Sequence, residues 1–240
     1  MIETELALAT PDGTMPTFIV RPDRGGPFPV VFMFMDGLGM RDALRDLARR
    51  LATSGYYVLL PDLYYRDHVG EPISLAAPDA MAKIMKLVRS VTVERAMNDA
   101  RTALAYAAGD AAARPGPIGV MGYCMGGRLS VAATQAMNDR VVAAVSIHPG
   151  FMDEALAEYV GSDLDAVKAS IYVGAADNDP SFSDKTREAL GAALAAHSID
   201  FEIELHPGSV HGYFVPGERH EKPTAEKVWS RALALFARKL

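Results

Sequence analysis

The sequence predicts an α/β fold in which helices cover both faces of a mostly parallel central sheet. Short runs rich in β-branched and aromatic residues alternate with longer runs whose apolar residues recur at helical spacing. The run at residues 29–35, PVVFMFM, is apolar throughout, as a strand covered on both faces should be. With 240 residues, half of them hydrophobic (50%), the chain is long enough to bury one large core.

The predicted elements begin with strands at residues 3–8 and 15–21, which the turn Pro11-Asp12-Gly13 joins as an antiparallel pair. After the apolar strand, a helix is expected at residues 40–53, because its leucines share one face. No repeat or linker-like break interrupts the alternation, so we expect a single domain over residues 1–240. Further strands are expected at residues 56–60, 118–123, 141–147, 171–174 and 201–205, and further helices at 80–88, 93–108, 125–135, 183–196 and 224–237.

Composition limits the kinds of molecule that the protein is expected to bind. The net charge is −6 and Lys and Arg do not cluster, which argues against a nucleic-acid surface. A single cysteine allows no internal disulfide, the acidic N-terminus lacks a signal peptide, and no apolar run is long enough to span a bilayer. No group of His, Cys, Asp and Glu has the spacing of metal ligands. We therefore expect a cytoplasmic protein without metal or membrane contact, and nothing requires more than a monomer.

The most informative segment is IGVMGYCMGG at residues 118–127, which places Cys124 between a strand and a helix. Gly122 and Gly126 flank this turn, where strand and helix backbones approach too closely for a β-carbon. The pattern matches the nucleophile elbow of α/β-hydrolases, with cysteine in place of serine. The helix N-terminus favours the thiolate form of Cys124, which predicts a nucleophile rather than a small buried cysteine.

A thiolate nucleophile needs a base, and the base needs an orienting carboxylate. In α/β-hydrolases the chain order is nucleophile, acid, histidine. Asp177 follows the strand at 171–174 and His211 follows the strand at 201–205, so these two are predicted to complete the triad. Asp179 remains the alternative acid, with a turn or helix cap as its structural role, whereas His206 is expected to pack or cap at its strand end.

Acyl transfer also needs backbone donors for the oxyanion of the tetrahedral intermediate. In this fold one donor is the N–H after the nucleophile, here Met125, and the other comes from the loop after an earlier strand. That loop is Asp36-Gly37-Leu38-Gly39, so the N–H of Gly37 is the predicted second donor.

Several of these segments resemble the dienelactone hydrolase family. The similarity lies in MDG at 35–37, LARRLATSGYYVLLPDLYY at 47–65, GYCMGGR at 122–128, GAAD at 174–177 and HGYF at 211–214. It therefore extends over most of the chain. The resemblance implies hydrolysis of a small ester or lactone through a cysteinyl acyl-enzyme, without a cofactor. Tyr64 and Phe214 are expected to contribute an apolar surface to the substrate pocket, and His148 also ends a strand where it would line that pocket.

Two positions depart from the family pattern. Well-studied members have a glutamate in the oxyanion loop that holds the resting thiol, where this chain has Asp36, one methylene shorter. Asp36 therefore has two expected roles, a substrate-side contact that gates the thiol or an ordinary turn residue. Those members also clamp a substrate carboxylate with an arginine four residues after the histidine. This chain has Val215 there and no arginine until Arg219, which favours less anionic substrates.

Two other functions remain open from the sequence. A non-catalytic small-molecule binding protein can occupy a hydrolase scaffold, because a fold does not guarantee chemistry. An acyltransferase would keep the acyl-enzyme and pass the acyl group to an acceptor other than water.

Overall fold

A computed structural model describes all residues, 1–240, and the chain divides into two compact units, Met1–Gly116 and Pro117–Leu240. The expectation of a single domain over residues 1–240 stays a prediction. No helix in the chain combines the length and the apolar character needed to cross a membrane.

The first unit contains four strands in the order β1-β2-β4-β3. β1 (Ile2–Thr10) and β2 (Gly13–Arg21) form the expected antiparallel hairpin, and β2 also pairs antiparallel with β4 (Tyr57–Pro61). β3 (Val30–Phe34) lies parallel to β4. Every residue of β3 and β4 is buried, whereas β1 alternates between exposed and half-buried residues, as an edge strand does.

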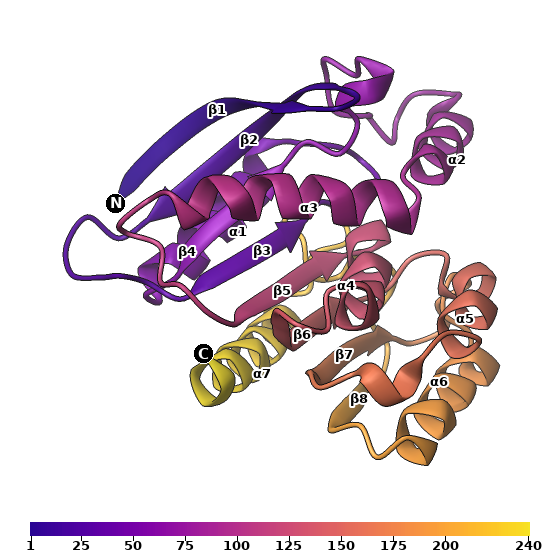
Figure 1. The fold of residues 1–240 in the computed structure, drawn as a ribbon. Coiled ribbons are helices and arrows are strands. Elements are labelled where there is room, and N and C mark those ends of the chain that lie inside the picture. Colours follow the sequence, from indigo (N-terminus) through magenta and orange to yellow (C-terminus); the bar gives the residue numbers. More distant parts are fainter. The chain divides into compact units, whose positions relative to one another are not determined.

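Three helices pack around these strands. α1 (Asp42–Thr53) contacts β2 and β4 through a face that includes Leu44, Leu47 and Leu51. α3 (Val93–Ala108) contacts β1 and β4 from the other face (Figure 1). The hydroxyl of Thr92 caps this helix by accepting from Arg95 N. α2 (Ala80–Ser90) precedes α3, and a short 3₁₀ turn, Tyr65–Asp67, follows β4.

The second unit contains four parallel strands in the order β5-β6-β7-β8. Their bounds are Ile118–Tyr123, Val141–Ile147, Ser170–Ala176 and Phe201–His206. Because the carboxyl ends of parallel strands meet at one edge, the loops that follow these four strands gather there. Those loops carry Cys124, His148, the two candidate aspartates and His211.

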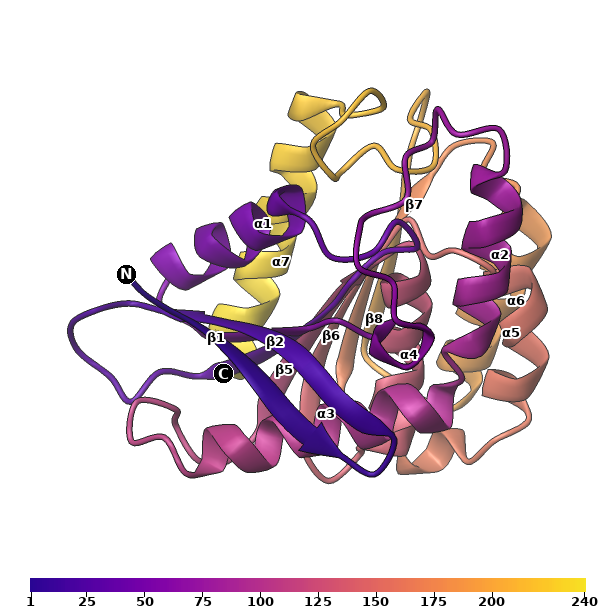
Figure 2. The same cartoon turned by 90° about the horizontal axis from the view of Figure 1, so that it is seen from above.

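Helices cover both faces of this second group of strands. α4 (Met125–Ala136) packs on β5 and β6, while α6 (Asp184–Ala196) packs on β8. α7 (Lys222–Lys239) contacts β6 and β7 from the opposite face (Figure 2). The strands and helices expected from the sequence are therefore present, which confirms the predicted α/β architecture.

One helix was not expected. α5 (Met152–Val160) packs on α4 and α6 rather than on a strand, and only Met152 and Tyr159 among its nine residues are buried. A helix that buries so little has a weak apolar period, and for this reason its sequence does not stand out from a loop. A short 3₁₀ turn, Leu164–Ala166, follows it.

Candidate active site

The turn at Cys124 has the backbone of a nucleophile elbow. β5 ends at Tyr123 and α4 begins at Met125, so Cys124 alone makes the reversal, with φ 53° and ψ −117°. A positive φ is costly for a residue with a side chain and persists only where the surroundings hold it. Gly122 must be glycine, because a Cβ there would overlap the carbonyl group of Gly126. The strand–turn–helix geometry expected for Cys124 is therefore present.

The segment after β6 holds this strained turn from the side. The N–H of Cys124 donates to the carbonyl of Ile147 at 3.1 Å, and the N–H of Gly150 donates to the carbonyl of Cys124 at 2.8 Å. A Cβ on Gly150 would lie 2.6 Å from Cys124 Sγ. Gly150 therefore leaves the space that the thiol occupies. Sequence reasoning did not assign Gly150 a role, although its place after a strand end was the available signal.

His211 lies between Cys124 and a buried carboxylate. Its Nδ1 is 2.7 Å from Oδ2 of Asp179, whose side chain is 0% exposed. The ring also hydrogen-bonds Cys124, and because Nδ1 faces the carboxylate, Nε2 is the nitrogen left for the thiol. Asp179, His211 and Cys124 thus form one connected chain of side chains, all within the second unit.

The expected pairing of Asp177 with His211 is not what the structure shows. Asp177 is the first residue after β7, and its Oδ2 instead accepts from the backbone N–H of Gly208 at 3.1 Å. Asn178 then takes the left-handed conformation, φ 52°, which turns the chain and directs Asp179 inward. Asp179 Oδ1 accepts from Ser181 N at 2.8 Å, which fixes the carboxylate. The sequence feature that could have indicated Asp179 is Asn178, between the two aspartates, because Asn tolerates positive φ.

The charges around His211 favour its protonated form. Burial alone lowers the pKa of this imidazole, but the charge of Cys124 and its hydrogen bond, together with the bond to Asp179, outweigh that effect and raise the pKa to about 10. At neutral pH the ring is therefore an imidazolium next to the sulfur of Cys124. Such a pair can attack an acyl carbon and later return a proton to a leaving group.

The predicted oxyanion donors belong to different units. Met125 is the first residue of α4 and directly follows Cys124 in the chain. Gly37 follows β3, its carbonyl accepts from the hydroxyl of Tyr64 at 3.1 Å, and a Cβ on it would crowd Ile84 and Val88. The assignment of both N–H groups to the oxyanion stays a prediction.

The two aromatic residues expected at the substrate are both buried. Tyr64 is 0% exposed and supports the Gly37 loop through its hydroxyl. Phe214 is 2% exposed and stacks on Tyr123, with ring centroids 5.3 Å apart, and on Trp229 at 6.1 Å. Both therefore pack within their own units, and a substrate contact for either stays a prediction.

Asp36 uses both carboxylate oxygens within its own loop. Arg41 donates Nη1 to Oδ1 and Nη2 to Oδ2, each at 2.6 Å, and Leu38 N donates to Oδ1 at 3.0 Å. This arrangement matches the turn role of the two that were expected. No pattern in the sequence indicates this role for Arg41, which reaches back from the position just before α1.

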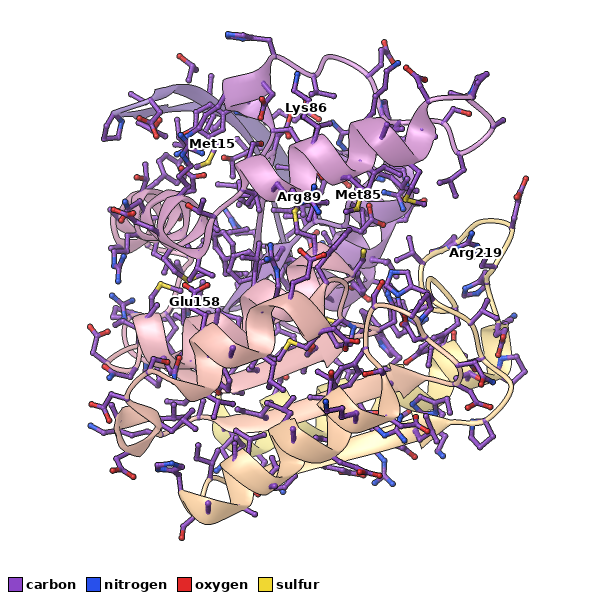
Figure 3. The ribbon with its side chains drawn as sticks, turned by 90° about the vertical axis from the view of Figure 1, so that its right-hand side faces the viewer. Met15, Met85, Lys86, Arg89, Glu158 and Arg219 are labelled. Carbon is purple, nitrogen blue, oxygen red and sulfur yellow. The ribbon has the colours of Figure 1, made fainter.

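The loop between β8 and α7 holds an arginine near the histidine. Arg219, labelled in Figure 3, is exposed, and its Nη1 donates to the backbone carbonyl of His211 at 3.3 Å. Its aliphatic part lies beside Gly212, while Val215 is buried. No group of three or more His, Cys, Asp or Glu side chains is arranged to hold a metal ion.

The chain is similar to several known proteins. The model of the dienelactone hydrolase family matches residues 15–240. A Methylorubrum extorquens protein named "Putative carboxymethylenebutenolidase" is 29% identical over 239 residues, which cover 96% of this chain and 79% of that protein. An Escherichia coli K12 protein of the same name is 29% identical over 235 residues, 92% of this chain and 82% of that protein.

A solved structure gives the same result for the whole chain. The crystal structure of a "Putative Dienelactone Hydrolase" from Klebsiella pneumoniae is 25% identical, superposes with a TM-score of 0.84, and covers 99% of this chain and 98% of its own. The fold is thus that of the α/β-hydrolases. From the family match and this likeness together, the chain belongs to the dienelactone hydrolase family, a family of hydrolases.

Proposed function

We propose that this hydrolase cleaves small carboxylic esters or lactones through an acyl intermediate on Cys124, with His211 as general base and acid and Asp179 as its orienting carboxylate. The observation that carries the proposal is the connected chain Asp179–His211–Cys124, with Cys124 on a strained turn at the start of a helix. This arrangement supplies the nucleophile, the base and the orienting carboxylate that nucleophilic acyl transfer requires.

The reaction begins with attack of the Cys124 sulfur on the acyl carbon. The C–S bond forms, and the carbonyl oxygen becomes an oxyanion, which the N–H groups of Met125 and Gly37 would bind. Collapse of this intermediate breaks the C–O bond to the alcohol, and the His211 imidazolium gives its proton to that oxygen. In a lactone the alcohol stays tethered to the acyl group.

The second half of the reaction releases the acid. Neutral His211 takes a proton from water, whose oxygen attacks the thioester carbon, and collapse of the new oxyanion expels the Cys124 thiolate. The imidazolium and thiolate are then restored. Asp179 accepts from Nδ1 throughout, which keeps Nε2 directed at the reacting atoms.

One feature of the chain favours less anionic substrates. Val215 occupies the position at which well-studied relatives have a clamping arginine, and a buried valine cannot bind a carboxylate. Asp36 is already bonded to Arg41, so we assign it to the loop rather than to gating of the thiol. Uncharged aryl esters and small lactones are therefore the first substrates to test.

Intact-protein mass spectrometry after mixing with such a panel tests the proposal directly. Wild type should show a transient acyl adduct that Cys124→Ala lacks, and turnover should fall to the background rate in that variant. Cys124→Ser should keep the fold and retain weak activity, because a serine hydroxyl depends more on its base. Retained turnover in folded Cys124→Ala would refute the proposal, and products formed with added alcohols or thiols would indicate acyl transfer.

A further inference from the structure

His148 is a buried imidazole that the proposed reaction does not use. It is 1% exposed, it follows β6, and its backbone takes a positive φ of 35°. The N–H of its backbone donates to the carbonyl of Gly174 at 2.8 Å, which fixes its place beside β7. Neither ring nitrogen has a hydrogen-bond partner in another residue. A buried polar ring without partners is costly, so its presence calls for a physical reason.

The ring of His148 packs directly against the histidine of the triad. Its centroid is 5.0 Å from that of His211, with the planes at 66°, so the edge of one ring meets the face of the other. Tyr213 packs on it at 5.4 Å and 72°, and Tyr123 lies at 6.5 Å. His148 therefore occupies a side of His211 that neither Cys124 nor Asp179 contacts.

The two histidines are held in opposite protonation states. Burial, and after it the positive charge of His211, hold the pKa of His148 well below its usual range, so its ring is neutral. His211 is protonated at the same pH, because Cys124 and Asp179 face it. Tyr213 carries no charge either, since burial raises the pKa of its hydroxyl. A buried neutral aromatic ring thus lies against a cation whose side chain is 21% exposed.

We propose that His148 is a positioning residue whose neutral aromatic ring stabilises the protonated form of His211 and holds its plane between Cys124 and Asp179. A cation attracts a neighbouring neutral π-system, and the attraction is stronger when both are desolvated. The ring also fills space beside His211 without adding a second positive charge. The inference rests on the triad of the proposed function, because it assigns His148 to that same site.

The test is an NMR titration of His211 in protein labelled at histidine Cε1, with its signal assigned by its loss in His211→Gln. The variant His148→Asn removes the ring and tolerates positive φ. Its His211 midpoint should fall by about 0.5–1.5 pH units relative to wild type, the shift expected for losing one cation–π contact. His148→Phe, which keeps an aromatic face, should stay near the wild-type midpoint. His148→Met supplies a second ring-free variant if His148→Asn does not fold.

His206→Asn is the matched control. His206 is also buried and packs on Tyr213, at 5.5 Å, but no contact joins it to His211. Its variant should leave the His211 midpoint unchanged. An unchanged midpoint in folded His148→Asn would overturn the inference, as would an equal fall in His206→Asn or in His148→Phe. The titration needs no substrate, so failure of ester hydrolysis with a normal shift would count against the proposed function alone.

Discussion

Each unit contains a buried carboxylate that contacts a cation, and the two pairs have different capacities. Asp36 bonds Arg41 through both oxygens, and the guanidinium stays charged at any accessible pH. Asp179 bonds only one nitrogen of His211, which can lose its proton and has a second nitrogen directed at Cys124. The first pair can only hold a loop, whereas the second can move a proton. A short ion pair can therefore take part in proton transfer only when one member can lose its proton and has a second polar atom that faces another group.

The largest effect is expected from neutralising the second pair. Asp179→Asn should lower kcat on an activated ester by about 10³–10⁴-fold, because an amide cannot hold the same tautomer or support the imidazolium. Asp177→Asn is the matched control, since its carboxylate only accepts from Gly208 N, and kcat should change by less than about tenfold. Stopped assays of both variants at pH 7 decide between the two aspartates, and the reverse ranking would restore Asp177 as the acid.

A smaller effect, on stability rather than on rate, is expected from breaking the Asp36–Arg41 pair. Arg41→Ala leaves the Asp36 carboxylate, which is 7% exposed, without its two bonds, and should lower the free energy of unfolding by about 1–3 kcal/mol. Arg45→Ala removes contacts to the exposed carboxylates of Glu5 and Asp42 and should cost less than about 1 kcal/mol. Urea denaturation measures both. Equal losses of stability in the two variants would mean that the bidentate contact between Arg41 and Asp36 contributes no more than an exposed ion pair.

A further expected effect is a dependence of stability on pH that, of the two pairs, only the second shows. The folded-state pKa of His211, about 10, lies above the unfolded value of about 6.5. The stabilisation is then fully present below pH ~6.5 and is lost as the pH rises toward ~10. The stability difference between wild type and His211→Gln, measured in urea at several pH values, should shrink over that window. A difference that stays constant would show that His211 does not gain its proton affinity from folding.

Much of the fold was predictable because its strands are short, apolar and separated by helices with a clear period. β3 and β4 are buried throughout and stand out, whereas α5 packs on other helices and does not. Chain order and glycine spacing are enough to predict Cys124 and His211 as candidates. The choice between Asp177 and Asp179 depends on one left-handed residue, Asn178, and spacing alone does not specify that backbone angle.

The sequence also does not predict which side chains from different segments contact one another. Nothing in the spacing pairs Asp36 with Arg41, because a carboxylate after a strand has several partners within reach of a flexible arginine. The packing of His148 on His211 joins loops 63 residues apart in the chain and depends on the order of the parallel strands. Sequence patterns predict which residues reach the same sheet edge, but the contacts among them follow from packing.

The missing side chain at Gly150 has a consequence for stereochemistry. The backbone of Gly150 lies against one side of the Cys124 sulfur, so closely that even a methyl group would collide with it. In the proposed mechanism, an acyl carbon would therefore reach the sulfur from the remaining sides, and the groups on a substituted α-carbon would meet different surroundings. Two mirror-image esters with a stereocentre next to the carbonyl would then fit unequally. The same glycine that makes room for the thiol thus limits the directions from which a substrate can approach it.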